Sequence, residues 1–205
     1  AVASLPETAS GVVPPTATKV VMLVTGYLPL LHLLAVAAVS LRAPGGGWAR
    51  AGLGLATLYL LPPLGARLTA LVLPPRHGEF GMGERGFLAW WVGAQWQIVF
   101  NRLRLLEELL RLLPGAYSTW LRLWGARVGS LVYWSPGVEI VDRALVDVGD
   151  GAVLGLGARL TGHVLMPMEG GARLLVAPIT IGPRALVGAY SVISPGVEIG
   201  EGQAS

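Results

Sequence analysis

A six-residue repeat runs through the C-terminal part of the chain, from Val128 to Ser205. An apolar residue returns every six positions, and a small residue tends to follow it four positions later. Neither a helical period nor simple alternation gives that spacing. A parallel β-helix does, because each unit forms one short strand and a corner, and three units complete one turn of a prism. The residues expected in its interior are Val128, Trp134, Ile140, Val148, Leu154, Leu160, Leu175, Ile181, Val187, Ile193 and Ile199.

Two irregularities interrupt the repeat. Two extra residues, Val146 and Asp147, precede the unit that begins at Val148, and we expect them to bulge the coil. A longer interruption follows Leu165 and occupies residues 166–173, which predicts an excursion loop. The repeat is still running at Ser205, whereas a solenoid needs a cap on its last coil. We therefore expect the β-helix to be truncated at this end, or covered there by another subunit.

The composition excludes several classes of protein. The chain is 53% hydrophobic and only 13% charged, with a mean hydropathy of +0.62, and the excess of apolar residues lies in its first half. The net charge of +3 comes from arginines dispersed among leucines, so no basic stripe suited to nucleic acid is present. No cysteine occurs, which rules out disulfides and cysteine-based metal or nucleophile chemistry.

The N-terminal half predicts membrane-spanning helices. Residues 1–18 read as a flexible leader, and residues 20–41 form an uncharged apolar segment of about 22 residues, long enough to span a bilayer. Within it, Tyr27 and Pro29 predict a local irregularity, and His32 is either a functional group or, as we favour, an imidazole bonded to a nearby carbonyl.

A second apolar segment covers residues 51–73 and contains Pro62-Pro63 and Arg67. A kinked span or a re-entrant pair in which Arg67 meets a headgroup or a carboxylate is one interpretation. A helix that ends near Pro62, with Arg67 snorkelling, is the other.

Three shorter segments connect these helices to the repeat. After a polar connector at 74–85, the tryptophan-rich stretch 86–100 is expected to lie in the headgroup region. Residues 101–113 predict an amphipathic helix with solvated or headgroup-facing charges, and residues 117–124 a last short helix. The organisation predicted is a leader at 1–18, a transmembrane and interfacial helical region at 19–125, and a β-helix catalytic domain at 126–205.

The units from Val128 onward resemble the repeats of the hexapeptide-repeat acyltransferases, over about the last two fifths of the chain. The form that this chain resembles is a membrane-anchored one. The resemblance implies a left-handed β-helix, a homotrimer, and an acyl donor that is acyl-CoA or an acyl-carrier-protein phosphopantetheine. It also implies a histidine base in the groove between neighbouring subunits, with the excursion loop helping to cover the donor. The same scaffold serves γ-type carbonic anhydrases, domains attached to nucleotidyltransferases, and binding or structural proteins.

His163 is the candidate catalytic base. It is the only histidine in the repeat and lies just before the excursion, and imidazole titrates in the range that general base catalysis needs. Backbone N–H groups around Gly162 are candidates for stabilising an oxyanion. One coil to either side, alignment of the units places Arg143 and Tyr190 beside His163 as candidate substrate-binding residues. The alternative is that His163 is merely an outward polar residue.

A carboxylate is expected to orient the base. Asp142, Asp147 and Glu169 are available, and Asp147 and Glu169 are the two that we assign to the site. An equally good interpretation of Asp142 is a corner residue whose side chain caps a turn. No metal is expected, because His32 and His77 lie outside the repeat, and no glycine-rich phosphate loop supports nucleotidyl transfer.

The function predicted is transfer of an acyl group from a pantetheine thioester to a hydroxyl or amine, with a membrane lipid or lipid-like molecule as the acceptor. We expect the protein in a membrane, as in a bacterial inner membrane. The β-helix is expected on the cytoplasmic side, because acyl thioesters are cytoplasmic. Two alternatives remain: a non-enzymatic trimeric membrane scaffold, and an acyl-transfer module of a larger synthetase.

Overall fold

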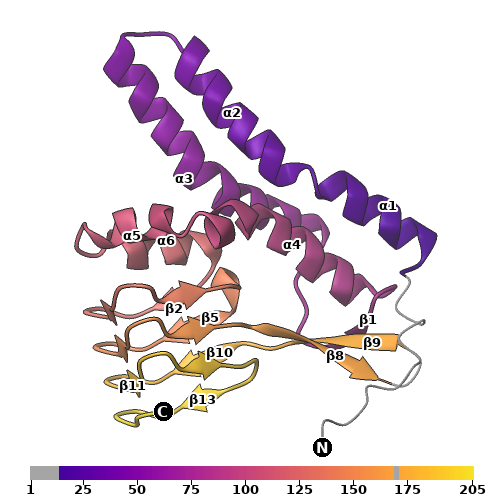
Figure 1. The fold of residues 1–205 in the computed structure, drawn as a ribbon, viewed down its shortest axis with the longest axis vertical. Coiled ribbons are helices and arrows are strands. Elements are labelled where there is room, and N and C mark those ends of the chain that lie inside the picture. The colour runs from indigo at the N-terminus through magenta and orange to yellow at the C-terminus, as the bar shows by residue number, and fades with distance from the viewer. Residues whose placement is uncertain (1–13, 169–170) are drawn as a thin grey trace, which may run out of the picture.

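The computed structural model describes residues 14–168 and 171–205. Its C-terminal half is a stack of coils built from short parallel strands (Figure 1). One sheet contains β2 (Arg127–Val128), β5 (Val146–Val148), β10 (Ile179–Ile181) and β13 (Glu198–Ile199). The second contains β3 (Tyr133–Trp134), β6 (Val153–Leu154) and β11 (Leu186–Val187). The third contains β4 (Glu139–Ile140), β7 (Arg159–Leu160) and β12 (Val192–Ile193).

The strand register confirms the six-residue spacing. In the first sheet Val128, Val148, Ile181 and Ile199 lie one above another, and all four are buried. The equivalent columns in the other sheets are Trp134, Leu154 and Val187, and Ile140, Leu160 and Ile193. These columns fill the prism, so its stability comes mainly from stacked aliphatic side chains. The left-handed sense of the coil stays a prediction.

The bulge predicted at Asp147 is wrong. Asp147 lies in a regular strand, β5, paired with Arg127 on one side and Thr180 on the other. The extra length is taken up earlier, in the 3₁₀ turn η2 (Arg143–Leu145). This turn forms because the Arg143 side chain is drawn inward beneath the helices, where it is almost fully buried.

The excursion is a β-hairpin and is longer than the loop that the sequence predicts. Strands β8 (His163–Met168) and β9 (Gly171–Val176) pair antiparallel, so Leu175 belongs to the hairpin and not to the prism interior. A third strand, β1 (Gly78–Gly81), pairs with β9. The sequence predicts only a polar connector there, but this strand joins the helical region to the hairpin. The candidate residue Glu169 lies outside the described residues.

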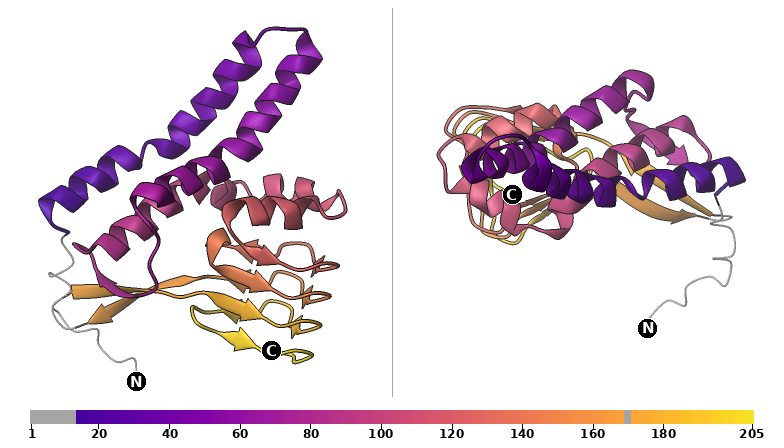
Figure 2. Two further views of the ribbon diagram at one scale, coloured as in Figure 1. Left: turned by 180° about the vertical axis from the view of Figure 1, so that it is seen from behind. Right: turned by 90° about the horizontal axis from the view of Figure 1, so that it is seen from above.

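Helices α2 (Leu28–Arg42) and α3 (Gly47–Val72) form an antiparallel pair that projects from the rest of the molecule (Figures 1 and 2). Helix α1 (Thr16–Thr25) directly precedes α2. Residues Thr16–Arg42 and Gly47–Val72 are long and apolar enough to cross a membrane, with mean hydropathies of 2.1 and 1.4 over an 18-residue window of each. A turn at Gly26-Tyr27 separates α1 from α2, at the irregularity that the sequence predicts.

The predicted end of the second helix near Pro62 is wrong, because α3 runs through Pro62-Pro63. Each proline lacks the N–H that would bond the carbonyl four residues earlier. Those two carbonyls find other donors: His32 Nε2 lies 3.1 Å from the Leu58 oxygen, and Trp120 Nε1 lies 2.8 Å from the Tyr59 oxygen. The favoured reading of His32, an imidazole bonded to a carbonyl, is therefore confirmed.

Arg67 bonds another helix of the protein. Its guanidinium donates to the carbonyls of Arg122 and Leu123, at 2.8 and 2.6 Å. These carbonyls lie at the C-terminal end of α6 (Ala116–Trp124), where a positive charge is also favoured by the helix dipole. Arg67 thereby ties α3 to the helix that enters the prism.

Helix α4 (Arg85–Arg102) lies between the long helices and the prism (Figure 1). We expected its residues in the headgroup region, but many of them, among them Phe87, Val92 and Phe100, are buried inside the protein. The amphipathic helix predicted at 101–113 is the shorter α5 (Leu105–Arg111). The prediction that its charges are solvated is wrong for Glu107 and Arg111, whose side chains are buried, whereas Glu108 is partly exposed.

Candidate active site

A buried ionic cluster forms where α5 meets η2. The Arg143 side chain is 1% exposed, and its Nε and Nη2 both donate to Glu107 Oε1, the first at 3.0 Å. Its backbone N–H and Nη1 donate to Gln97 Oε1 at 2.8 and 3.1 Å. The prediction that Arg143 contacts substrate is therefore wrong. Its role is to fix residues 142–145 against the helices.

Asp142 immediately precedes this anchored turn, and its carboxylate receives three donors. His163 Nδ1 lies 2.6 Å from Asp142 Oδ2, and the Gly162 backbone N–H donates to the same oxygen at 2.9 Å. Trp90 Nε1 donates to the other carboxylate oxygen at 3.2 Å. The Asp142 side chain is 5% exposed, so these bonds compensate for its removal from water.

This arrangement selects one form of the neutral imidazole. An ionised carboxylate only accepts, so Nδ1 of His163 carries the proton and Nε2 keeps its lone pair. The His163 side chain is 25% exposed, and the Trp90 ring lies against it at a centroid distance of 4.5 Å. The result is a fixed imidazole with a free basic nitrogen, which is the arrangement of a general base.

The dyad borders a cavity of about 630 Å³. One wall is the break between α1 and α2, with Gly26, Pro29 and Leu30. The opposite wall is α4, which supplies apolar groups together with the polar side chains of Gln95, Asn101 and Arg102. Since α1 and α2 form one of the candidate membrane spans, the cavity lies between the base and the apolar helices.

A second cavity, of about 270 Å³, reaches His163 from the side of the hairpin. Trp90, Trp91 and His163 line both cavities. The remaining lining residues are apolar: Met22, Met82, Phe87, Val164, Leu165 and Leu174.

Two other predicted site residues, Asp147 and Tyr190, lie away from His163. The Asp147 carboxylate pairs with the Arg127 guanidinium at 2.6 Å, on the outside of β5. Tyr190 is 72% exposed at a corner of the prism, where its ring lies over Gly157. The hairpin lengthens the coil so that Leu160 pairs with Ile193, which moves Tyr190 away from the position that even spacing predicts.

Gly162 is beside the base. Its N–H is occupied by Asp142, and its carbonyl accepts from the Ala177 N–H. A Cβ at this position would come within 2.7 Å of Leu145 Cδ1. Glycine is therefore required for the close approach of the coil to η2, and the Gly162 N–H itself is already bonded to Asp142.

The sequence did not identify Trp90 and Gln95 as site residues. Both lie on α4, far from His163 along the chain, and no spacing rule connects them to the repeat. Asp142 was named only as one of several carboxylates. The feature of the sequence that points to Asp142 is its position between the strand that ends at Ile140 and the two extra residues, Val146 and Asp147.

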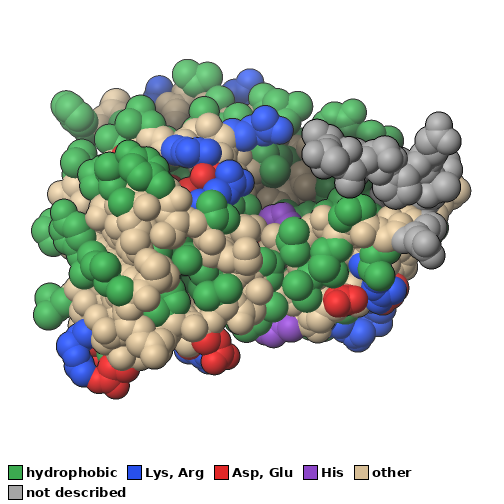
Figure 3. All heavy atoms as spheres, turned by 60° about the horizontal axis from the view of Figure 1, so that its bottom comes forward, with side chains coloured by type: hydrophobic (Ala, Val, Ile, Leu, Met, Phe, Trp, Pro, Cys, Tyr) green, Lys and Arg blue, Asp and Glu red, His purple; other side chains and the backbone are tan. Residues whose placement is uncertain are grey.

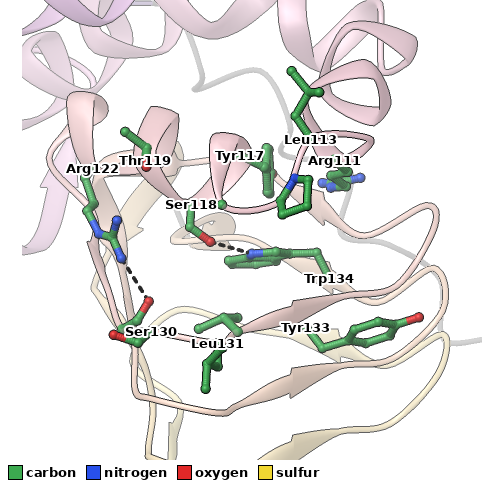
Figure 4. A pocket seen from close by; sticks show the side chains of 14 residues that line it. Arg111, Leu113, Tyr117, Ser118, Thr119, Arg122, Ser130, Leu131, Tyr133 and Trp134 are labelled. Atoms are coloured by element: carbon green, nitrogen blue, oxygen red, sulfur yellow. Dashed lines mark hydrogen bonds between the residues drawn. The ribbon is translucent and has the colours of Figure 1, made fainter.

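Another large pocket, of about 580 Å³, lies between α6 and the first coil (Figure 4). Its polar groups bond to the protein: Trp134 Nε1 donates to Ser118 Oγ at 2.9 Å, and Arg122 donates to the Val128 and Gly129 carbonyls. Its lining contains no histidine or carboxylate, so it offers no base. Across residues 14–168 and 171–205, no group of three or more metal-binding side chains is found.

No protein-family model matches this sequence, and no curated protein matches it. Among solved structures, the chain is similar to a galactoside acetyltransferase in complex with coenzyme A. The sequence identity is 18%, the match covers 53% of this chain and 68% of that chain, and the TM-score is 0.33. A likeness of that extent carries no argument about function, which has to come from the site itself.

Proposed function

We propose that the protein transfers an acyl group from a pantetheine thioester to a hydroxyl or amine, with His163 as the general base. The observation that supports this most directly is the Asp142–His163 pair, whose His163 lines two cavities. The six-residue repeat, which resembles that of acyltransferases, supports the same reaction class.

The proposed reaction is a direct transfer. The acceptor oxygen or nitrogen attacks the thioester carbonyl carbon while its proton passes to His163 Nε2. The C–S bond then breaks as the tetrahedral intermediate collapses, and the imidazolium returns the proton to the thiolate. Asp142 stabilises the imidazolium and holds the ring in place. Gln95, which lines the cavity and carries a carboxamide, is the candidate donor to the carbonyl oxygen.

We propose a lipid-like acceptor, held in the larger cavity. The wall formed by Gly26, Pro29 and Leu30 belongs to an apolar helical segment, and Gln95 and Arg102 offer polar contacts on the opposite side. In this account α2 and α3 anchor the protein in a membrane, with the prism on the side where acyl thioesters are present.

We also propose a homotrimer. Apolar side chains are exposed on the outer faces of the prism, and hydrophobic groups are visible at many places on the surface in Figure 3. The exposed residues concerned are Leu131, Tyr133, Leu186, Tyr190 and Val192. A contact between subunits would bury them. Light scattering of the protein in detergent measures the number of chains.

The reaction is tested with purified protein in detergent, radiolabelled acyl-CoA or acyl-carrier protein, and a total lipid extract. We expect label in a lipid product together with release of free thiol, and no label when the lipid extract is omitted. A protein that releases no thiol and transfers no label with either donor would instead be a scaffold.

A further inference from the structure

We infer that the acyl chain of the donor occupies the smaller cavity, so that the hairpin and α4 select the length of the group that is transferred. This inference rests on the proposed function, because it assigns a place to one of the two proposed substrates.

The position of the smaller cavity supports this assignment. It meets the larger cavity at Trp90, Trp91 and His163, so a molecule in either one ends beside the same imidazole. Transfer between two substrates requires this arrangement, because the acceptor must reach the carbonyl carbon while its proton reaches the base. A carbonyl at the junction would place its alkyl chain on one side and the acceptor on the other.

The polarity of the residues that line each cavity indicates which substrate that cavity binds. Apart from the shared residues, the smaller cavity is lined by thioether, aromatic and aliphatic side chains, which offer no strong hydrogen bond to a headgroup. The larger cavity is lined in part by residues with polar side chains, Gln95, Asn101, Arg102 and Asp142. A hydrocarbon chain therefore suits the smaller cavity, and an acceptor with a polar head suits the larger one.

The size of the smaller cavity sets a limit on the chain. A methylene group takes about the space of a water molecule, roughly 30 Å³. The volume of about 270 Å³ then holds fewer than about ten carbons of the chain. Leu174 is 1% exposed and belongs to the wall, so its side chain limits the volume from the hairpin side.

The test compares acyl donors of increasing chain length, from acetyl to palmitoyl, in the transfer assay. Leu174→Ala enlarges the cavity, and we expect the preferred donor to become longer by two carbons or more. Leu165→Trp fills it from a residue that is 50% exposed, and we expect at least a tenfold loss with octanoyl-CoA but not with acetyl-CoA. Met168→Trp is the matched control, because Met168 lies on the same strand, is 54% exposed and does not line the cavity.

An unchanged chain-length profile in both cavity variants would overturn the inference while leaving the proposed function intact. Equal losses in Leu165→Trp and Met168→Trp would overturn it too, because they would reflect damage to the hairpin. A wild-type protein that transfers no acyl group of any length contradicts the proposed function, and this inference with it.

Discussion

At the residue scale, the orientation of His163 depends on a carboxylate that is itself held by two further donors. Asp142 bonds the imidazole, the Gly162 N–H and the Trp90 indole at the same time. The ionic cluster around Arg143 anchors the next residue along the chain. The His163 imidazole is thereby held from the prism side and from the α4 side, as a preorganised site would require.

Asp142→Asn should lower the turnover number about a hundredfold, because the amide cannot hold the imidazole in the form that leaves Nε2 free. Initial rates of acyl transfer under saturating donor measure the effect. The matched control is Asp147→Asn, which makes the same chemical change on β5, where the carboxylate pairs with Arg127. We expect that variant to stay within about twofold of wild type. If Asp147→Asn is the slower of the two, the site has been assigned to the wrong carboxylate.

The sequence proposes His163 as the base and favours Asp147 and Glu169 as its carboxylate partners, whereas the carboxylate beside His163 in the structure is Asp142. The choice depends on how the two extra residues before Val148 are accommodated, and that depends on the burial of Arg143 under α5. Trp90 is separated from Asp142 by much of the helical region, so its part in the site follows from tertiary packing alone.

At the element scale, α3 persists through two adjacent prolines because two side chains from other helices bond the carbonyls that the prolines leave free. Proline inside a helix ordinarily ends or kinks it, and the sequence alone gives no sign of where replacement donors lie. Strand β1 was missed for a similar reason. Its four residues carry little strand signal, and the strand exists because β9 pairs with it.

His32→Leu should lower the free energy of unfolding by about 1–3 kcal/mol, because the Leu58 carbonyl is then left without a donor. Thermal unfolding in detergent, followed by circular dichroism, measures the change. His77→Leu is the control, since His77 is exposed in the segment before β1. Equal stability of the two variants would mean that the His32 bond does not support α3.

Alkaline pH should loosen the contact between α5 and α6. The Tyr117 hydroxyl donates to Glu107 Oε2 at 2.6 Å, and burial, with the Glu107 charge beside it, raises the pKa of Tyr117 far above its usual value of about 10. The unfolded chain releases this proton near pH 10 while the folded protein keeps it, so this part of the stability is present below pH 10 and lost above it.

The measurement for this contact is the unfolding temperature between pH 8 and pH 11. We expect it to fall more steeply above pH 10 in the wild type than in Tyr117→Phe, which has no proton to lose at this position. Parallel curves for the two proteins would show that Tyr117 does not couple to folding.

At the scale of the whole molecule, the site lies between two parts of the chain that the sequence presents as separate. The repeat predicts the prism, and hydropathy predicts the apolar helices, each from local pattern. The contacts that join them, β1 with β9 and Trp90 with Asp142 and His163, are long-range and leave no periodic signal. The fold class is therefore readable from the sequence to a large extent, whereas the cavities beside His163 are not.

Membrane anchoring is tested by flotation with liposomes. We expect the protein to float with the vesicles and to resist extraction by alkaline carbonate. Leu34→Arg, at a residue of α2 that is 55% exposed, should weaken this association because a charge in the bilayer core costs about 2.5–3.5 kcal/mol. Leu186→Arg, at a leucine of the prism that is 46% exposed, should leave flotation unchanged. If both variants remain soluble without lipid, the helices are not membrane anchors.

The central claim is that His163 is the base for acyl transfer, and the rate of transfer by His163→Gln tests it most directly. Glutamine keeps a polar side chain of similar length but cannot take the acceptor proton. With unfolding temperature measured alongside to show that the variant is folded, we predict a loss of at least about a hundredfold in the turnover number. A folded His163→Gln protein that transfers acyl groups at the wild-type rate would contradict the account.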